Sequence, residues 1–268
     1  MVARVIRLGV AGWPVGHSRS PAMHNAALAA LGLDGWRYLK LPLPPELFAE
    51  TVRALPAAGF RGINATIPHK EAALALASEA TPRARAIGAA NTLTFHPDTG
   101  AIHADNTDAP GLIEAIPASH APAGRSALVL GAGGAARAAV HALLEAGAAD
   151  VAVLNRTRER AERLVADLGG GRVVDAPVGA EIIVNATSIG LREFKALPLP
   201  ADTVDAGSCV VDMVYRVGGT RLLEVAKQRG AIGVDGLEIL VAQGAASLER
   251  WTGRPAPRDA MRRAATAV

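Results

Sequence analysis

The stretch RSALVLGAGGAARAAVHALLEAGAADVAVLNRT, residues 125–157, decides the fold. A short apolar run leads into a glycine-rich turn, an alanine-rich segment and a second apolar run, and this succession predicts one β–α–β unit. Further apolar runs at residues 181–187 and 208–213 continue the series. A parallel sheet with its connecting helices is therefore expected from residue 125 to about Asp235.

The glycine turn indicates a dinucleotide-binding site. Gly131, Gly133 and Gly134 lie between the first strand and the helix, and Ala136 takes the last position of a G-x-G-x-x-G pattern, which tolerates alanine. Glycine keeps the turn tight and lets backbone N–H groups approach a pyrophosphate at the helix N-terminus. A tight turn that holds no ligand is the alternative.

The end of the second strand favours NADP over NAD. NAD-binding proteins usually place Asp or Glu there for the ribose hydroxyls, and a carboxylate would repel a 2′-phosphate. Here residues 155–157 are Asn-Arg-Thr, and Arg156 and Arg160 can bind phosphate oxygens. Arg158 and Arg163 are expected only to form the solvated face of a helix.

Composition limits the classes of protein. The 268-residue chain is half apolar and one fifth charged, as in ordinary globular proteins, and its net charge of +3 comes without any basic run. Nucleic-acid binding therefore has little support. A lone Cys209 excludes an internal disulfide, and no apolar stretch suits a signal peptide or a membrane span, so a cytoplasmic protein without a membrane partner is expected. The seven histidines show no metal-ligand spacing, and no metal is expected.

Alternating β-like and helical segments also fill the first half of the chain, beginning with a strand at residues 4–12 and including a hairpin near residue 98. The Pro/Ala/Gly-rich segment at 117–124 is typical of a connection between domains. From Leu237 the sequence predicts two helices. The pattern as a whole is that of an α/β protein.

Lys70 is a candidate for proton transfer. Only four of the 28 basic residues are lysines, and Lys70 follows the strand-like GINATI at 62–67. Lysine can release a proton in a protein, whereas arginine cannot. Hydride delivery to a ketone leaves an alkoxide that needs a proton, which a lysine beside a carboxylate can supply. Of the two nearby acids, Asp108 is expected to be a helix N-cap, so Asp105 is the expected partner; a surface role for Lys70 is the alternative.

The turn GWPVGHSRSPAMHN, residues 12–25, suggests a site for a substrate carboxylate. Ser18 and Ser20 lie where a helix is expected to begin, and a helix N-terminus with two hydroxyls suits an anion. Ser20 before Pro21 equally fits a simple N-cap and first helical residue. Amide and hydroxyl residues near other strand ends and glycine turns suit a polyhydroxylated ligand, although each also fits a turn or cap; they are Asn64, Thr66, Asn91 and Gln243.

Nine motifs together resemble the shikimate dehydrogenase family, and they occur in the family's order over nearly the whole chain. The motifs are GxPxxHSxSPxxHN at 12–25, NATIPHK at 64–70, GAANT at 88–92, DNTD at 105–108, GAGGAARA at 131–138, NRT at 155–157, NATSIG at 185–190, DMVY at 212–215 and DGLEILVAQGA at 235–245. The first four are specific and do not arise from a generic dinucleotide-binding domain.

The resemblance implies an NADP-dependent enzyme that interconverts 3-dehydroshikimate and shikimate in chorismate and aromatic amino acid biosynthesis, with Lys70 and Asp105 as the catalytic pair. It implies a substrate domain, residues 1–112 plus 237–268, completed by the C-terminal helices, and a Rossmann-type NADP domain, residues 113–236, in a monomer or homodimer. The implied substrate-binding residues are Ser18, Ser20, Asn64, Thr66, Asn91, Asp105, Tyr215 and Gln243. The implied cofactor-binding residues are Gly131, Ala132, Gly133, Gly134, Ala135, Asn155, Arg156, Thr157, Arg160, Thr187, Met213 and Gly236.

Departures from the family pattern leave fine specificity open. Ala65 and Leu191 replace the usual Val and Met, and residues 192–195 carry an unusual Arg-Glu-Phe-Lys. A quinate/shikimate dehydrogenase of catabolic role is one alternative, and a non-catalytic sensor of a shikimate-like ligand is another, although the intact pair of Lys70 and Asp105 argues against a sensor. A folate-linked dehydrogenase of similar plan does not account for the Ser-x-Ser turn.

Overall fold

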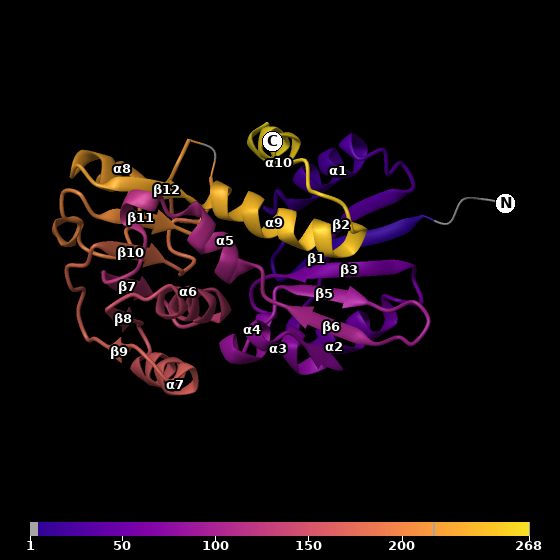
Figure 1. The fold of residues 1–268 in the computed structure, drawn as a ribbon, viewed down its shortest axis with the longest axis horizontal. Coiled ribbons are helices and arrows are strands. Elements are labelled where there is room, and N and C mark those ends of the chain that lie inside the picture. Colours follow the sequence, from indigo (N-terminus) through magenta and orange to yellow (C-terminus); the bar gives the residue numbers. More distant parts are fainter. Residues whose placement is uncertain (1–4, 217, 268) are drawn as a thin grey trace. The chain divides into compact units, whose positions relative to one another are not determined.

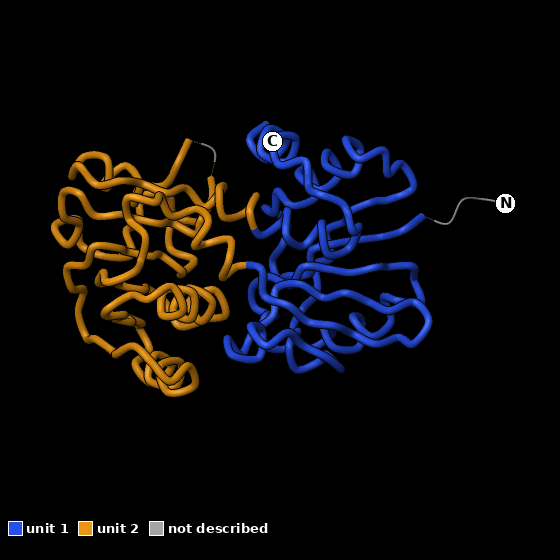
Figure 2. Tube along the Cα trace, viewed as in Figure 1, with its two compact units in different colours: residues 1–107, 243–268 blue, residues 108–242 orange. Residues whose placement is uncertain are grey.

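The computed structural model describes residues 5–216 and 218–267, so Arg4 of the first predicted strand lies outside the described residues. The chain divides into two compact units: unit 1 comprises residues 1–107 and 243–268, and unit 2 comprises residues 108–242 (Figure 2). Each unit contains a six-stranded sheet with helices, which confirms the predicted α/β fold class. The predicted domain boundaries, at 112/113 and 236/237, stay a prediction.

The sheet of unit 1 is mixed and has the order β2-β1-β3-β5-β6-β4. Its strands are β1 (Ile6–Gly12), β2 (Trp36–Pro42), β3 (Phe60–Ala65), β4 (Glu79–Ala80), β5 (Thr92–Phe95) and β6 (Ile102–Asp105). β1 is parallel to β2 and β3, whereas β5 is antiparallel to β3 and β6. The antiparallel β5–β6 pair is the predicted hairpin, and it brings the residues that follow β6 beside those that precede β5.

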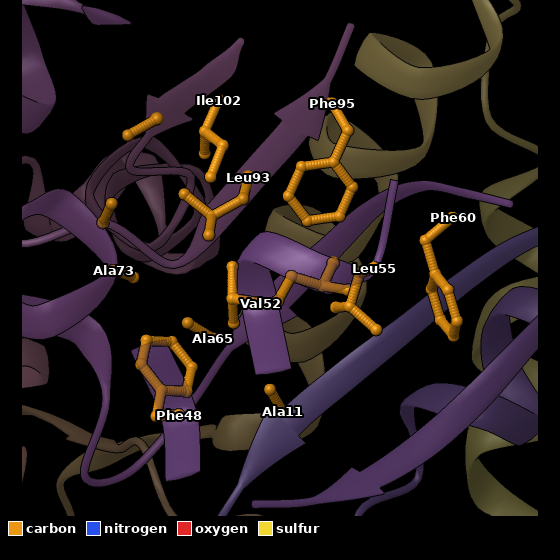
Figure 3. Packing of buried hydrophobic residues seen from close by; sticks show 13 residues of the cluster. Ala11, Phe48, Val52, Leu55, Phe60, Ala65, Ala73, Leu93, Phe95 and Ile102 are labelled. Atoms are coloured by element: carbon orange, nitrogen blue, oxygen red, sulfur yellow. The ribbon is translucent and has the colours of Figure 1, made fainter. Parts of the chain in front are cut away.

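Helices on unit 1 bury its apolar residues. They are α1 (Ser20–Ala30), α2 (Pro45–Ala54), α3 (Lys70–Leu76), α4 (Pro82–Ile87), α10 (Arg258–Thr266) and the second half of α9 (Gly236–Thr252). α1 and α10 lie side by side (Figure 1). In the core cluster of Figure 3, Phe48 and Val52 of α2 pack with Leu93 and Phe95 of β5. Each such buried side chain contributes roughly 1.5–3 kcal/mol.

Unit 2 has a fully parallel sheet of order β12-β11-β10-β7-β8-β9 (Figure 1). The chain order reverses between the central strands β7 and β10, as in the doubly wound dinucleotide-binding fold. Its elements are β7 (Ser126–Leu130), β8 (Asp150–Leu154), β9 (Arg172–Val173), β10 (Ile182–Asn185), β11 (Cys209–Asp212), β12 (Ile232–Asp235), α5 (Asp108–Ala115), α6 (Gly134–Glu145), α7 (Arg158–Leu168), α8 (Arg221–Gln228) and the first half of α9, with short 3-10 turns at Ala118–His120 and Ala201–Thr203.

Helices start at Ser20 and at Asp108, so each of these two residues lies one position inside the helix that it was expected to cap. Ser20 is the first residue of α1 and its side chain makes no capping bond, because Arg19 holds the N-cap position. Asp108 is likewise the first residue of α5 and not the residue before it. These shifts matter because Ser20 and Asp108 had been expected to cap helices, and the side chain of Ser20 does not do so.

Candidate functional site

Amide and hydroxyl side chains of unit 1 form one buried hydrogen-bonded cluster. The Asn91 amide donates to Gln243 Oε1 at 3.2 Å and to Thr107 Oγ1 at 2.9 Å, and Asn91 Oδ1 accepts the Thr107 backbone N–H at 2.8 Å. Asn64 Nδ2 lies 2.9 Å from Ser247 Oγ, and Ser247 Oγ lies 2.8 Å from Thr92 Oγ1. Three predicted substrate residues, Asn64, Asn91 and Gln243, are therefore brought together in one network.

Asn64 is held in a single orientation by its neighbours. The Tyr38 hydroxyl donates to Asn64 Oδ1 at 2.7 Å, and Asn64 Nδ2 donates to the Asn91 carbonyl at 3.1 Å and to Ser247. Tyr38 itself stacks on the buried ring of His24, with 4.2 Å between ring centroids. Asn64 therefore holds the Asn91 backbone in place, and its own contact with a substrate stays a prediction.

The two serines of the first turn are placed differently from each other. Ser18 Oγ accepts the Ser20 backbone N–H at 3.3 Å. Within residues 5–216 and 218–267, Ser20 Oγ makes no hydrogen bond, although the residue is largely buried at the start of α1. The capping alternative for Ser20 is therefore removed, and its hydroxyl can serve a ligand.

Lys70 is the first residue of α3, and the turn before it is tightly held. His69 donates its backbone N–H to the Thr66 carbonyl at 2.8 Å, which closes the turn at Thr66–His69. The His69 ring is buried against Phe48, with 4.1 Å between centroids, and its Nε2 lies 2.7 Å from the Leu43 carbonyl. Burial lowers the pKa of His69, which favours the neutral ring, and Nε2–H donates the hydrogen bond to Leu43. These contacts fix the backbone that carries Lys70.

Asp105, the expected partner of Lys70, is bound by other side chains. Its Oδ1 accepts the Thr81 hydroxyl at 2.7 Å and the Asn106 N–H at 2.7 Å, Arg83 reaches both oxygens at 3.1 Å, and Arg250 donates to Oδ2. Burial alone would raise the pKa of this carboxyl, but the Thr81 hydrogen bond and the charges of Arg250 and Arg83 outweigh it and leave the pKa below its usual range. These contacts give no support to a pairing with Lys70.

The glycine turn of unit 2 fits a pyrophosphate. Gly131 has a backbone φ of +110°, which residues with a side chain rarely adopt, and a Cβ there would meet the Ala186 carbonyl at 3.2 Å. Gly133, the N-cap of α6, has no atom within 4 Å of the place of a Cβ. The turn therefore leaves an open face in front of the first N–H groups of the twelve-residue α6, where an anion is stabilised.

Two arginines beside this turn are available to a phosphate. The side chains of Arg156 and Arg160 are exposed after β8, and among the described residues neither guanidinium makes a hydrogen bond or an ion pair. Arg158, in contrast, is bound to Glu162 at 2.7 Å and to Asp175, as expected for a solvated helix face. Asn155 donates to the Thr157 carbonyl at 2.8 Å and so shapes the end of the strand.

Comparison with known proteins decides the family. Three family models match: the shikimate dehydrogenase substrate binding domain over residues 10–93, shikimate/quinate 5-dehydrogenase over 117–187, and the shikimate 5′-dehydrogenase C-terminal domain over 236–266. The shikimate dehydrogenase (NADP(+)) of Paracoccus denitrificans (strain Pd 1222) is 47% identical over 271 residues, which cover 97% of this chain and 95% of that protein. The chain belongs to the shikimate dehydrogenase family.

Solved structures of this family have the same fold. Shikimate 5-dehydrogenase from Thermus thermophilus, in complex with NADP(H) and shikimate, matches with a TM-score of 0.89 and 43% identity over 98% of this chain and 99% of that one. A 5-ketofructose reductase of Gluconobacter sp. strain CHM43 matches with a TM-score of 0.85 and 32% identity over 98% and 99%. The predicted family and the two-domain plan are confirmed, and one relative of the same fold is named for another substrate.

Several residues of this chain that contact the Asn91 cluster or Asp105 were not expected from the sequence. Ser247 lies one helical turn after Gln243, so the spacing on α9 could have indicated it. Thr107 lies inside the DNTD motif, between Asp105 and Asp108. Tyr38, which contacts Asn64, and Arg83 and Arg250, which contact Asp105, carry no local signal in the sequence, because the tertiary fold alone brings these pairs together.

Asp212 of the DMVY motif links two loops of unit 2 that carry predicted cofactor residues. It accepts hydrogen bonds from Asn185 at 2.8 Å, from the Val214 N–H at 3.1 Å and from Thr220 at 2.6 Å. Asn185 also accepts the Thr187 hydroxyl at 2.7 Å. The NATSIG loop and the residues after β11 are thus tied to one buried carboxyl.

We expect the stability conferred by Asp212 to fall as pH rises. Burial is the main cause that raises the pKa of Asp212 to about 6, and the charge of Asp235 adds to it against the three hydrogen bonds. Because the folded state holds the proton more tightly than the unfolded chain, whose Asp titrates near 3.8, the free energy of unfolding drops between those two pH values. The neutral Asp212→Asn variant escapes this loss, which is about 3 kcal/mol.

Thermal unfolding at about pH 4 and about pH 7 measures this effect. The difference in melting temperature, variant minus wild type, should increase with pH, whereas the exposed Asp202→Asn serves as the control and should show a constant difference. A difference for Asp212→Asn that does not change with pH would contradict the expectation.

Of the residues that the structure describes, no group of three or more His, Cys, Asp or Glu side chains is arranged to hold a metal ion. No helix among those residues combines the length and the apolar character that crossing a bilayer requires.

Proposed function

We propose that the chain interconverts 3-dehydroshikimate and shikimate with NADP, in chorismate and aromatic amino acid biosynthesis in the cytoplasm. The observation that carries this proposal is the buried amide and hydroxyl cluster around Asn91 in a chain that matches shikimate dehydrogenases over nearly its full length. Shikimate carries one carboxylate and three hydroxyl groups, and such a ligand is recognised by groups that both donate and accept hydrogen bonds.

The substrate carboxylate is assigned to Ser18 and Ser20, and the ring hydroxyls to the amide cluster. The free Ser20 hydroxyl at the start of α1 supports the first assignment. The contact of Asn91 with Gln243 supports the second, since two facing amides present both a donor and an acceptor. Thr66 and Tyr215 remain predicted substrate residues on the strength of the family motifs alone.

NADP, when bound, supplies or accepts the hydride. The open turn at Gly133 and the first N–H groups of α6 would hold its pyrophosphate, and Arg156 and Arg160 would hold the 2′-phosphate. Asn155 and Thr157 shape the strand end beside these arginines. The remaining cofactor assignments rest on the motifs: Ala132, Gly134, Ala135, Thr187, Met213 and Gly236.

Lys70 is proposed to exchange a proton with the reacting hydroxyl. The sequence offered two carboxylates to assist it, Asp105 and Asp108. The five donor contacts of Asp105 use both of its oxygens, which favours Asp108 for this role. Asp108 is buried as the first residue of α5. We propose it for the role that the sequence analysis gave to Asp105.

Initial rates of oxidation with NADP and with NAD, on shikimate, on quinate and on the reduced product of 5-ketofructose, test this function. Shikimate with NADP should give the highest kcat/KM. The third substrate is included because the Gluconobacter 5-ketofructose reductase matches almost the whole chain. Higher kcat/KM on quinate or on the ketofructose product, or none on any of the three, would overturn the proposal.

The cofactor assignment is tested in the same assay with Arg156→Ala. Loss of a charge-assisted contact of about 1.5–3 kcal/mol should raise the KM for NADP by roughly 10- to 100-fold and leave the KM for NAD nearly unchanged. Arg158→Ala is the matched control, because that neighbouring arginine is bound to Glu162 and Asp175. Equal loss with both cofactors would show that Arg156 does not read the 2′-phosphate.

A further inference from the structure

The side chain of Asp105 joins three elements of unit 1. Asp105 ends β6 and is 1% exposed, Thr81 and Arg83 belong to the start of α4, and Arg250 belongs to the last turn of α9. The side chains of Arg83 and Arg250 are 35% and 40% exposed, so each guanidinium reaches inward from the surface to a buried carboxylate. We call Asp105, Arg83 and Arg250 the carboxylate clamp.

Removal of one partner from such a cluster is costly, because a buried charge loses its compensation. Arg83 contacts both carboxylate oxygens, and Thr81 also caps α4 by accepting the Ala84 N–H at 3.1 Å. Without Arg250, Asp105 would still have Thr81 and Arg83 as partners. Arg250 is therefore the member whose main effect is on α9, and it is the member to change in an experiment.

α9 is anchored to the same sheet at two further points. Trp251 Nε1 donates to the Leu93 carbonyl at 3.1 Å, and Gly62 leaves room for the indole, since a Cβ there would lie 2.2 Å from Nε1. Ser247 Oγ contacts Thr92 at 2.8 Å and donates to the Gln243 carbonyl at 3.0 Å. The anchors at 247, 250 and 251 occupy the two turns that follow Gln243.

We propose that the carboxylate clamp is a positioning device for substrate binding: it fixes the register of α9 on the unit 1 sheet, so that Gln243 meets Asn91. This proposal rests on the proposed function, in which Gln243 and Asn91 bind substrate hydroxyls. The Asn91–Gln243 hydrogen bond is 3.2 Å long, which is the upper end of the usual range. A shift of α9 by a fraction of an ångström would therefore weaken it. The clamp acts through Gln243 and takes no part in the chemical step.

Three variants separate positioning from chemistry. Arg250→Met keeps the stem of the side chain and removes the charge, and Arg250→Lys keeps a charge that can still donate to Asp105. As a control, Arg172→Met removes an exposed Arg–Asp pair, with Asp150, on the surface of unit 2. Each variant is assayed for kcat and for the KM of shikimate at saturating NADP. Hydrogen exchange of the peptide 239–252 is measured in parallel.

Arg250→Met should raise the KM for shikimate by about tenfold, the effect of one weakened hydrogen bond to the ligand, with kcat within about threefold of wild type. Arg250→Lys should recover most of the loss, and Arg172→Met should behave as wild type. Exchange of the 239–252 amides should be faster in Arg250→Met alone. An unchanged KM, or a loss confined to kcat, would overturn the proposal.

Hydrogen exchange keeps this test separate from the test of function. If the wild type does not oxidise shikimate, the proposed function fails, yet exchange still shows whether Arg250 holds α9. Faster exchange in Arg250→Met than in Arg172→Met would then support the clamp as a fixture of the helix. Equal exchange in the two variants would overturn it.

Discussion

Lys70→Arg should lower the turnover of shikimate by about 10²–10⁴-fold, the usual range for a lost general acid–base group. Arginine keeps the positive charge and roughly the reach of lysine, but it does not give up its proton in a protein. The KM for NADP should change little, because the proposed cofactor residues belong to unit 2 and Lys70 belongs to unit 1. The measurement is kcat at saturating shikimate and NADP.

Lys227→Arg is the matched control, since that lysine is exposed on α8 and far along the chain from every proposed catalytic residue. It should leave kcat unchanged. Lys70→Ala should lose about as much turnover as Lys70→Arg. If Lys70→Arg instead kept most of its turnover while Lys70→Ala did not, Lys70 would act by its charge alone and the proton-transfer role would be removed.

Asp108→Asn should lower kcat by a similar factor of about 10²–10⁴, because the amide cannot assist a proton transfer as a carboxylate does. Asp105→Asn should keep kcat within about tenfold of wild type, since the charge that it removes is bound by two arginines and a threonine. Its melting temperature should fall, because both arginines lose their counter-charge. Both variants are assayed at saturating shikimate and NADP, together with thermal unfolding.

The opposite result would restore the pairing that sequence alone favoured. A loss of about 100-fold or more in kcat for Asp105→Asn, with the fold intact and with Asp108→Asn active, would place Asp105 in the chemical step. The two residues are three positions apart in one motif, so this pair of variants is closely matched.

The fold of unit 2 was predictable because its signals are local. Each strand, glycine turn and helix of residues 125–157 is encoded by neighbouring residues, and a right-handed β–α–β succession leaves few other topologies. The same holds for the β5–β6 hairpin of unit 1. Candidate site residues at strand ends and glycine turns, such as Asn91 and Gly131, follow from these local patterns.

The partners of Asp105, on which the proposed choice between Asp105 and Asp108 depends, were not predictable in this way. They include arginines 22 residues before Asp105 and 145 residues after it. The proposed choice also depends on whether Asp108 precedes α5 or begins it, and a shift of one residue changes the task of a side chain at a helix start. Long-range partners and element boundaries are the features that propensity and periodicity do not encode.

Unit 1 is built from two separate stretches of the chain, with all of unit 2 between them. During translation, the sheet of residues 5–107 therefore leaves the ribosome without its α9 and α10 partners, while residues 108–242 can already fold as a continuous segment. Until residues 243–267 follow, Gly62 lacks its contact with the Trp251 indole, and the side of α1 that meets α10 faces water. At this stage of synthesis, all residues of unit 2 are present, whereas unit 1 is incomplete and exposes apolar surface. Chaperones bind species of this kind.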